Sequence, residues 1–87
     1  MQDFRMETFL TVCELLNYTR AAEALHITQP AVSQHIRCLE EYYGVKLFRY
    51  EGKRLRLTEA GALLRNAATT MKHDEIILRE LLASGDR

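Results

Sequence analysis

Residues 18–37 have the sequence YTRAAEALHITQPAVSQHIR, which predicts two short helices joined by a tight turn. Thr19 has a side chain suited to cap the first helix, and the small apolar residues after it allow another helix to approach closely. The segment 26–28 interrupts the helical pattern and ends this helix. The rest of the chain is interpreted around this helix-turn-helix.

The second helix of this motif is expected over about residues 30–43. Thr28 or Gln29 can cap it, and Pro30 fits its first turn because no N–H is needed there. Gly44 is expected to end it. At 100° per residue the side chains divide into two opposite faces. The apolar face carries Val32, His35, Ile36, Leu39 and Tyr43, and the polar face carries Pro30, Ser33, Gln34, Arg37 and Glu41.

Further elements flank the motif on both sides. Apolar residues at helical spacing predict a helix over about residues 3–16, ended by Asn17 in a left-handed conformation. After the motif, leucines alternate with arginines over residues 54–57, the period-2 pattern of a half-exposed strand. A partner strand is expected before it, with Glu51-Gly52 as the turn of a short hairpin.

A long helix capped by Thr58 is expected over about residues 59–83. Its apolar residues follow steps of three and four, the spacing of a coiled-coil seam, and Asp74 occupies one position of that seam. Packing within the monomer is one alternative, but so long a helix on so small a domain favours pairing with a second copy. The residues expected at this dimer contact are Leu64, Ala67, Met71, Leu78 and Leu81.

These elements predict a mainly α fold, a winged helix-turn-helix with a three-helix core, a short β-hairpin wing and a long C-terminal linker helix. Residues 1–58 are expected to form the winged domain, and residues 59–87 the linker and dimerisation helix. The chain has 87 residues, 47% hydrophobic and 28% charged, which excludes a disordered or collagen-like chain. It has no apolar stretch long enough to span a membrane and no secretory signal, so a cytoplasmic protein is expected.

Positive charge is concentrated in the middle third of the chain, although the formal net charge is zero. Residues 29–58 hold six basic and three acidic residues, whereas the segments 1–28 and 59–87 carry net charges of −2 and −1. A focused positive patch is typical of proteins that bind a polyanion, although a solvated charged face has the same composition.

The polar face of the second motif helix has chemistry suited to duplex DNA. The major groove admits one helix, and Gln29 and Gln34 each offer the donor and the acceptor that pair with adenine. Ser33 can contact a base or a phosphate, and Arg37 can reach guanine or a phosphate unless it pairs with acidic residues of its own helix. Basic side chains of the hairpin can neutralise phosphates. The residues expected to contact DNA are Thr28, Gln29, Pro30, Ser33, Gln34, Arg37, Arg49, Lys53 and Arg54.

No catalytic, cofactor or metal site is expected. The three histidines lack the spacing of a metal site, and no P-loop, GxGxxG or HExxH motif occurs. Cys13 and Cys38 stand far apart without a CxxC, so a disulfide framework is not expected, and a redox role of Cys38 is the remaining alternative. We therefore predict that the chain is not an enzyme.

The run from Phe4 to Gly61, about two-thirds of the chain, resembles the N-terminal DNA-binding domain of LysR-type transcriptional regulators of bacteria. The residues that carry this resemblance are Phe9-Leu10, the segments 18–25, 28–33, 36–41 and 44–48, and Leu57-Thr58-Glu59-Ala60-Gly61.

The resemblance implies a sequence-specific transcription factor whose recognition helix starts near Gln29 and whose wing lies around Lys53-Arg54. It implies a homodimer formed through the linker helix, with higher oligomers in a full-length protein, and operators with dyad symmetry. It also implies a C-terminal effector domain that senses a small molecule. That domain is absent from these residues, so a fragment is expected rather than a naturally short protein.

Three positions depart from the family pattern. Many members place an acidic residue and then arginine after the Leu-Phe pair, whereas here Arg49 precedes Tyr50, and this swap sends the charge to the opposite face of a strand. Cys38 stands where a basic residue is common, and Asn17-Tyr18 replaces a more usual small residue and Phe. Arg49 is therefore the proposed DNA contact with the least family support.

A protein-interaction module is the alternative from a different functional class. It would keep the helix-turn-helix but dock a partner through the seam of the last helix, and the zero net charge favours it. Retention on a heparin or random-DNA column at low salt distinguishes the two.

Overall fold

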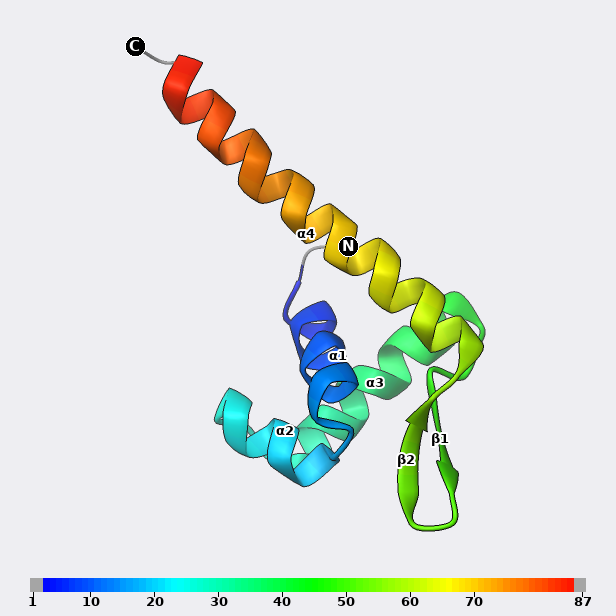
Figure 1. Cartoon of the computed structure of the whole chain (residues 1–87). Coiled ribbons are helices and arrows are strands. Elements are labelled where there is room, and N and C mark those ends of the chain that lie inside the picture. The colour runs from blue at the N-terminus through cyan, green and yellow to red at the C-terminus, as the bar shows by residue number, and fades with distance from the viewer. Residues whose placement is uncertain (1–2, 86–87) are drawn as a thin grey trace.

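The structure is a computed structural model that describes residues 3–85. Its elements in chain order are helices α1 (Phe4–Leu15), α2 (Tyr18–Leu25) and α3 (Gln29–Tyr43), strands β1 (Phe48–Glu51) and β2 (Arg54–Leu57), and helix α4 (Glu59–Gly85). The first three helices pack on one another, the strands form a hairpin beside them, and α4 extends far beyond this domain (Figure 1). The expected mainly α fold with a short wing is confirmed. None of the described helices combines the length and the apolar character needed to cross a membrane.

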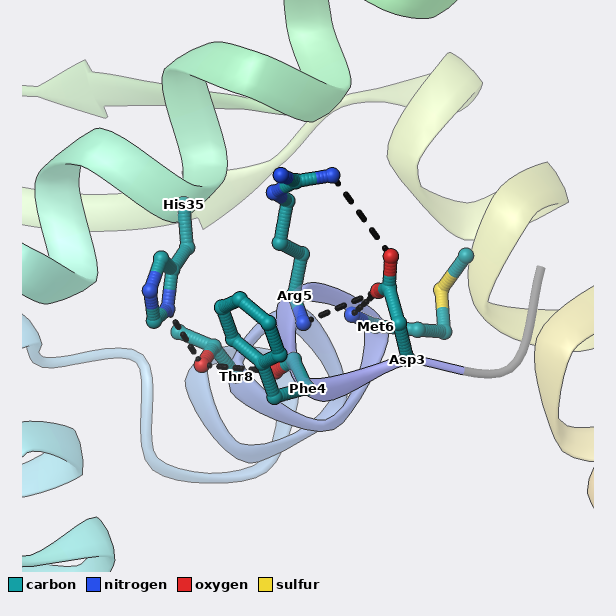
Figure 2. A network of polar contacts seen from close by, with 6 residues as sticks. All are labelled: Asp3, Phe4, Arg5, Met6, Thr8 and His35. Atoms are coloured by element: carbon teal, nitrogen blue, oxygen red, sulfur yellow. Dashed lines mark hydrogen bonds and ion pairs between the residues drawn. The ribbon is translucent and has the colours of Figure 1, made fainter.

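α1 is fixed at its start and on its inner face. The Asp3 side chain caps it by accepting hydrogen bonds from two backbone N–H groups of the first turn (Figure 2). The buried Thr8 hydroxyl donates to the Phe4 carbonyl at 3.0 Å, and its oxygen lies 2.8 Å from Nδ1 of His35 on α3 (Figure 2). This polar link helps to fix α3 against α1.

The corner between α1 and α2 differs from the expectation. Leu16, not Asn17, takes the left-handed conformation that ends α1, with φ 49° and ψ 43°. Asn17 is extended and caps α2 by accepting from the Arg20 N–H at 2.9 Å, the role expected for Thr19. The corner is therefore tighter than expected, because one helix ends and the next is capped at adjacent residues. Leu16 is left exposed, and the buried stripe of α1 ends with Val12.

α3 begins and ends as its flanking residues predict. The Thr28 hydroxyl caps it by accepting from the Ala31 N–H at 3.2 Å, and Pro30 lies in its first turn. Gly44 ends it with φ 69°, a left-handed conformation that glycine adopts without a steric cost. These local signals fix the length of the helix that carries most of the expected DNA contacts.

The hairpin is antiparallel, and its turn lies one residue later than expected. The paired residues are Phe48 with Leu57, Arg49 with Arg56, Tyr50 with Leu55, and Glu51 with Arg54. Glu51 is thus the last residue of β1, and the two-residue turn consists of Gly52 and Lys53. Gly52 has φ 64°, the positive value that such tight hairpin turns favour at their first position. The turn places Lys53 at the tip.

A single apolar core joins all these elements. Its largest fully buried side chains are Phe9, Val12, Val32, Leu39 and Leu47. α4 is attached at its start by Thr58, whose hydroxyl donates to the Lys46 carbonyl and accepts from the Gly61 N–H. Gly61 packs so closely that a Cβ there would lie 2.5 Å from Cδ1 of Leu57 and against the Leu47 carbonyl oxygen.

The apolar stripe of α4, expected at a contact with a second copy, packs partly on its own domain. Leu64 and Met71 are partly buried against the core of their own domain, next to Ala68, which is 2% exposed. In contrast, Leu78 and Leu81 are 54% and 65% exposed. The domain covers the stripe near the start of α4, as far as Met71, and Leu78 and Leu81 lie on the part of α4 that extends beyond the domain.

Candidate nucleic-acid interface

Three of the five residues expected on the apolar face of α3 are buried, whereas His35 is half-buried and Tyr43 is 39% exposed near the end of the helix. Val32, Ile36 and Leu39 are buried. On the opposite side the residues expected to contact DNA lie at the surface: Gln29, Pro30, Gln34 and Arg37 are exposed and Ser33 is half-buried. Thr28 is also exposed, next to this face, while its hydroxyl caps the helix. The polar face is therefore accessible to a ligand that approaches α3 from outside.

Side chains of this face interact with each other only through long, exposed hydrogen bonds. Gln29 Nε2 donates to the Ser33 hydroxyl at 3.3 Å, and Arg37 donates to Oε1 of Gln34 at 3.4 Å. Arg37 forms no ion pair with a described residue. Glu40 instead accepts from the Leu47 N–H at 2.8 Å. The Arg37 charge is therefore available to a phosphate or a guanine.

The basic residues of the hairpin fall into two groups. Glu51 forms ion pairs with both Arg49, at 3.1 Å, and Arg56, at 3.3 Å. Lys53 and Arg54 are exposed at the tip and take part in no ion pair within the described residues 3–85. The carboxylate thus offsets charge along the side of the hairpin and leaves the positive charge concentrated at its end.

A groove of about 210 Å³ lies where the wing meets the start of α3. Gln29 lines it from α3, Thr19 from α2, and Tyr50 and Lys53 from the hairpin. The outward face of α3 and the basic tip are therefore neighbours on one surface. That adjacency is what a winged helix-turn-helix needs in order to contact bases and backbone together.

The family model for bacterial regulatory helix-turn-helix proteins of the LysR family matches residues 4–62. The chain belongs to the LysR family. It is 43% identical over 68 residues to the uncharacterized HTH-type transcriptional regulator YxjO of Bacillus subtilis, covering 78% of this chain and 23% of that protein. The chain thus spans about a quarter of the length of that relative.

Solved structures agree with this assignment. A LysR-family transcriptional regulator from Eggerthella lenta is 70% identical, with a TM-score of 0.76 over 79% of this chain and 99% of that one. The chain in the CbnR DBD–DNA complex is 25% identical, with a TM-score of 0.89 over 100% of both chains. This chain therefore has the winged helix-turn-helix domain of LysR-type transcriptional regulators, and the relatives named here are transcriptional regulators.

Tyr18 also lines the groove between the wing and the start of α3 in this LysR-type domain. Its ring packs edge-on against Phe48, with 6.2 Å between the centroids. Burial, reinforced by the nearby Glu40 and Tyr50, raises the pKa of Tyr18 to about 12, so the phenol stays neutral at physiological pH. The tyrosine that departs from the family pattern thus serves as a core residue.

The two cysteines and the histidines form no metal-binding group within residues 3–85. Both cysteines are unpaired thiols of intermediate exposure. Burial raises the pKa of Cys13 to about 12, which makes its thiol a poor nucleophile at neutral pH.

Sequence reasoning missed two groups of exposed side chains. Tyr50 lines the groove and is 63% exposed, but only the strand register reveals on which face it lies. Leu63 and Ile77 are exposed apolar residues of α4 beside the expected dimer set, in which Ala67 is also exposed. Their spacing with Leu81 follows heptad steps, a signal that was present in the sequence.

Proposed function

We propose that this chain binds duplex DNA sequence-specifically as a homodimer, with α3 in the major groove and the hairpin tip on the sugar–phosphate backbone. The adjacency of the outward face of α3 and the basic tip across one groove carries this proposal. In this scheme Gln29, Ser33 and Gln34 contact base edges, because amide and hydroxyl groups on the first turns of a helix reach the groove floor.

The backbone contacts of the proposed interface come from cations. Arg37, Lys53 and Arg54 are exposed and have no acidic partner among the described residues, so they can neutralise phosphates. Thr28 and Pro30 lie at the start of α3, where they are proposed to approach the backbone. Arg49 is the member of the set with the weakest support, because its guanidinium is held by Glu51.

The proposed dimer contact lies on the exposed part of α4. Ala67, Leu78 and Leu81 are its members with accessible side chains, whereas Leu64 and Met71 contribute at most an edge because they pack on their own domain. An apolar groove lined by Tyr43, Val45, Leu47, Ala60, Leu63 and Leu64 adds to this surface at the start of α4. Exposed apolar area of this extent favours burial by a second copy.

We further infer that the protein acts in the bacterial cytoplasm, where its DNA target lies. Any response to a small-molecule effector, and any higher oligomer, is proposed to depend on parts of LysR-type regulators that this chain does not cover.

The salt dependence of binding tests the proposed function. With three or four cationic contacts for each subunit, a dimer neutralises roughly six to eight phosphates, so the slope of log K against log salt should be about −5 to −7. Fluorescence anisotropy with a duplex selected by the chain from a random pool measures this slope. A slope near zero would contradict DNA binding and favour the docking module.

Two substitutions separate base contacts from phosphate contacts. Gln34→Ala should relax discrimination at one base step by about 1–3 kcal/mol, and Lys53→Gln should weaken binding to all sequences and flatten the slope by about 1 for each subunit. Asn66→Ala and Lys72→Gln remove the same chemical groups from α4 and serve as controls, although the Lys72 ammonium, unlike that of Lys53, forms an exposed ion pair with Glu7 at 3.0 Å. Equal, sequence-independent effects of the first two variants would show that the division of roles is wrong.

A further inference from the structure

The register of the hairpin sorts its side chains into two faces of different character. Arg49, Glu51, Arg54 and Arg56 share one face, and Phe48, Tyr50, Leu55 and Leu57 share the other, because alternate residues of a strand point to opposite sides. On the first face the Glu51 carboxylate forms ion pairs with two of the three arginines. That face is therefore partly neutralised by its own residues.

Tyr50 is the exception on the second face. Phe48 and Leu55 on the same face are 6% and 7% exposed and belong to the core, whereas Tyr50 is 63% exposed. Its hydroxyl forms no hydrogen bond with any residue from 3 to 85. An exposed aromatic side chain on the core-facing side of a wing is not needed for packing.

The exposed side chain of Tyr50 lies between the start of α3 and the basic tip of the hairpin. It lines the groove of about 210 Å³ between the wing and the start of α3, together with Gln29 and Lys53. Gln29 lies at the beginning of the helix proposed to enter the major groove, and Lys53 lies at the basic tip. A backbone that passes from one to the other crosses Tyr50.

We propose that Tyr50, rather than Arg49, is the residue of β1 that contacts DNA, and that its hydroxyl donates a hydrogen bond to a phosphate oxygen beside Gln29. This inference rests on the proposed function, because it assumes that α3 and the wing face one duplex. Tyrosine hydroxyls are among the side chains that bind phosphate oxygens and set the register of a protein on DNA. A hydroxyl donor adds no positive charge to the interface, so the contact displaces no counterion.

Removal of one hydroxyl group tests this assignment. Tyr50→Phe should raise the dissociation constant for the duplex selected by the wild-type chain about three- to tenfold for each half-site, with an unchanged salt slope. Tyr42→Phe is the matched control, because Tyr42 is 70% exposed at the far end of α3 and outside the groove. It should bind as the wild type does.

A charge introduced at the same position gives a second readout that a structural role would not produce. Tyr50→Lys should steepen the salt slope by about 0.9 for each subunit, whereas Tyr42→Lys should leave it within error of the wild type. Arg49→Gln should change both the affinity and the slope less than Lys53→Gln does.

The outcomes separate this inference from the proposed function. Wild-type affinity of Tyr50→Phe together with an unchanged slope of Tyr50→Lys would overturn the assignment of Tyr50 while DNA binding stands. Failure of the wild-type chain to bind any duplex would overturn the proposed function and this inference with it.

Discussion

The winged domain and the distal half of α4 are both rich in large apolar residues, but they differ in how far these side chains are exposed to solvent. In the winged domain Phe9 and Val12 are fully buried, whereas Leu78 and Leu81 on α4 are 54% and 65% exposed. The first region completes a core from its own helices and hairpin. The second keeps its apolar side chains in solvent within residues 3–85, the exposure on which the proposed dimer contact rests.

The two regions also differ in what holds their helices in shape. α1, α2 and α3 are stabilised by the core between them, which is the main source of helix stability in proteins. The distal half of α4 relies on local contacts, such as the ion pair between Glu75 and Arg79 at 2.9 Å. Exposed pairs of this kind contribute only about 0.3–0.5 kcal/mol, so this part of α4 should gain much from a partner.

Removal of a core side chain should have the largest effect and break the comparison most clearly. Phe9→Ala should lower the free energy of unfolding by about 3–5 kcal/mol, because it opens a cavity in a fully buried site. Leu81→Ala should change it by less than about 0.5 kcal/mol in dilute samples. Urea unfolding followed by circular dichroism measures both. Similar losses of unfolding free energy in the two variants would contradict the contrast between a buried core and an exposed distal half of α4.

The junction of the two regions should give the next largest effect. Gly61→Ala should destabilise the fold by about 1–3 kcal/mol, because the added methyl group meets Leu57 and the Leu47 carbonyl. Gly85→Ala is the matched control, since no atom other than those of its chain neighbours and the adjacent helix backbone lies within 4 Å of the added carbon. It should be neutral or slightly stabilising, as expected for alanine in a helix. Equal thermal midpoints of the two variants would contradict the close packing.

A charged residue on the exposed face of α4 sharpens the comparison in a different quantity. Leu78→Lys combined with Leu81→Lys should raise the dimer dissociation constant at least about tenfold and leave the monomer folded, because burial of unpaired charge opposes association. Thr69→Lys, on another face of α4, serves as the control. Sedimentation equilibrium measures the constant, and a monomeric wild-type chain at high concentration would refute the dimer.

The smallest expected effect concerns a thiol at the edge of the core. The pKa of Cys13 is raised from 9.0 to about 12 by burial, so the unfolded chain loses this proton at lower pH than the folded chain. The stabilisation is complete below about pH 9 and declines as pH rises toward 12. Cys13→Ala should therefore lose less stability than Cys38→Ala when urea midpoints are compared at pH 8 and pH 10. Equal alkaline losses in the two variants would contradict the buried thiol.

The prediction from sequence succeeded where structure depends on neighbouring residues. α3 begins after Thr28 and ends at Gly44, as expected, because capping is decided within a few residues of the helix end. Periodicity alone predicted the buried Val32, Ile36 and Leu39 of α3, but it also placed Tyr43, which is 39% exposed, on the buried face. The prediction of the corner at Leu16 and Asn17 was wrong, because a positive φ is uncommon for leucine and its sequence gives no local signal of one.

The candidate interface was predictable in its residue types and not in its arrangement. The sequence marked Gln34 and Lys53 as chemically suited to DNA. It did not show that Glu51 would hold Arg49 while Tyr50 lines the groove beside α3, because these facts depend on the register of the hairpin and on its packing.

The sequence by itself determined the order of the elements, the capped ends of α3 and the burial of Val32, Ile36 and Leu39, since these depend on local propensity and helical period. Only the tertiary structure decided that Leu64 faces its own domain while Leu81 faces solvent, and that the basic tip lies beside the start of α3. The physical reason is that an apolar stripe or a charged loop specifies only the chemical kind of surface that it contacts. Which neighbour it meets is set by packing between residues far apart in the chain.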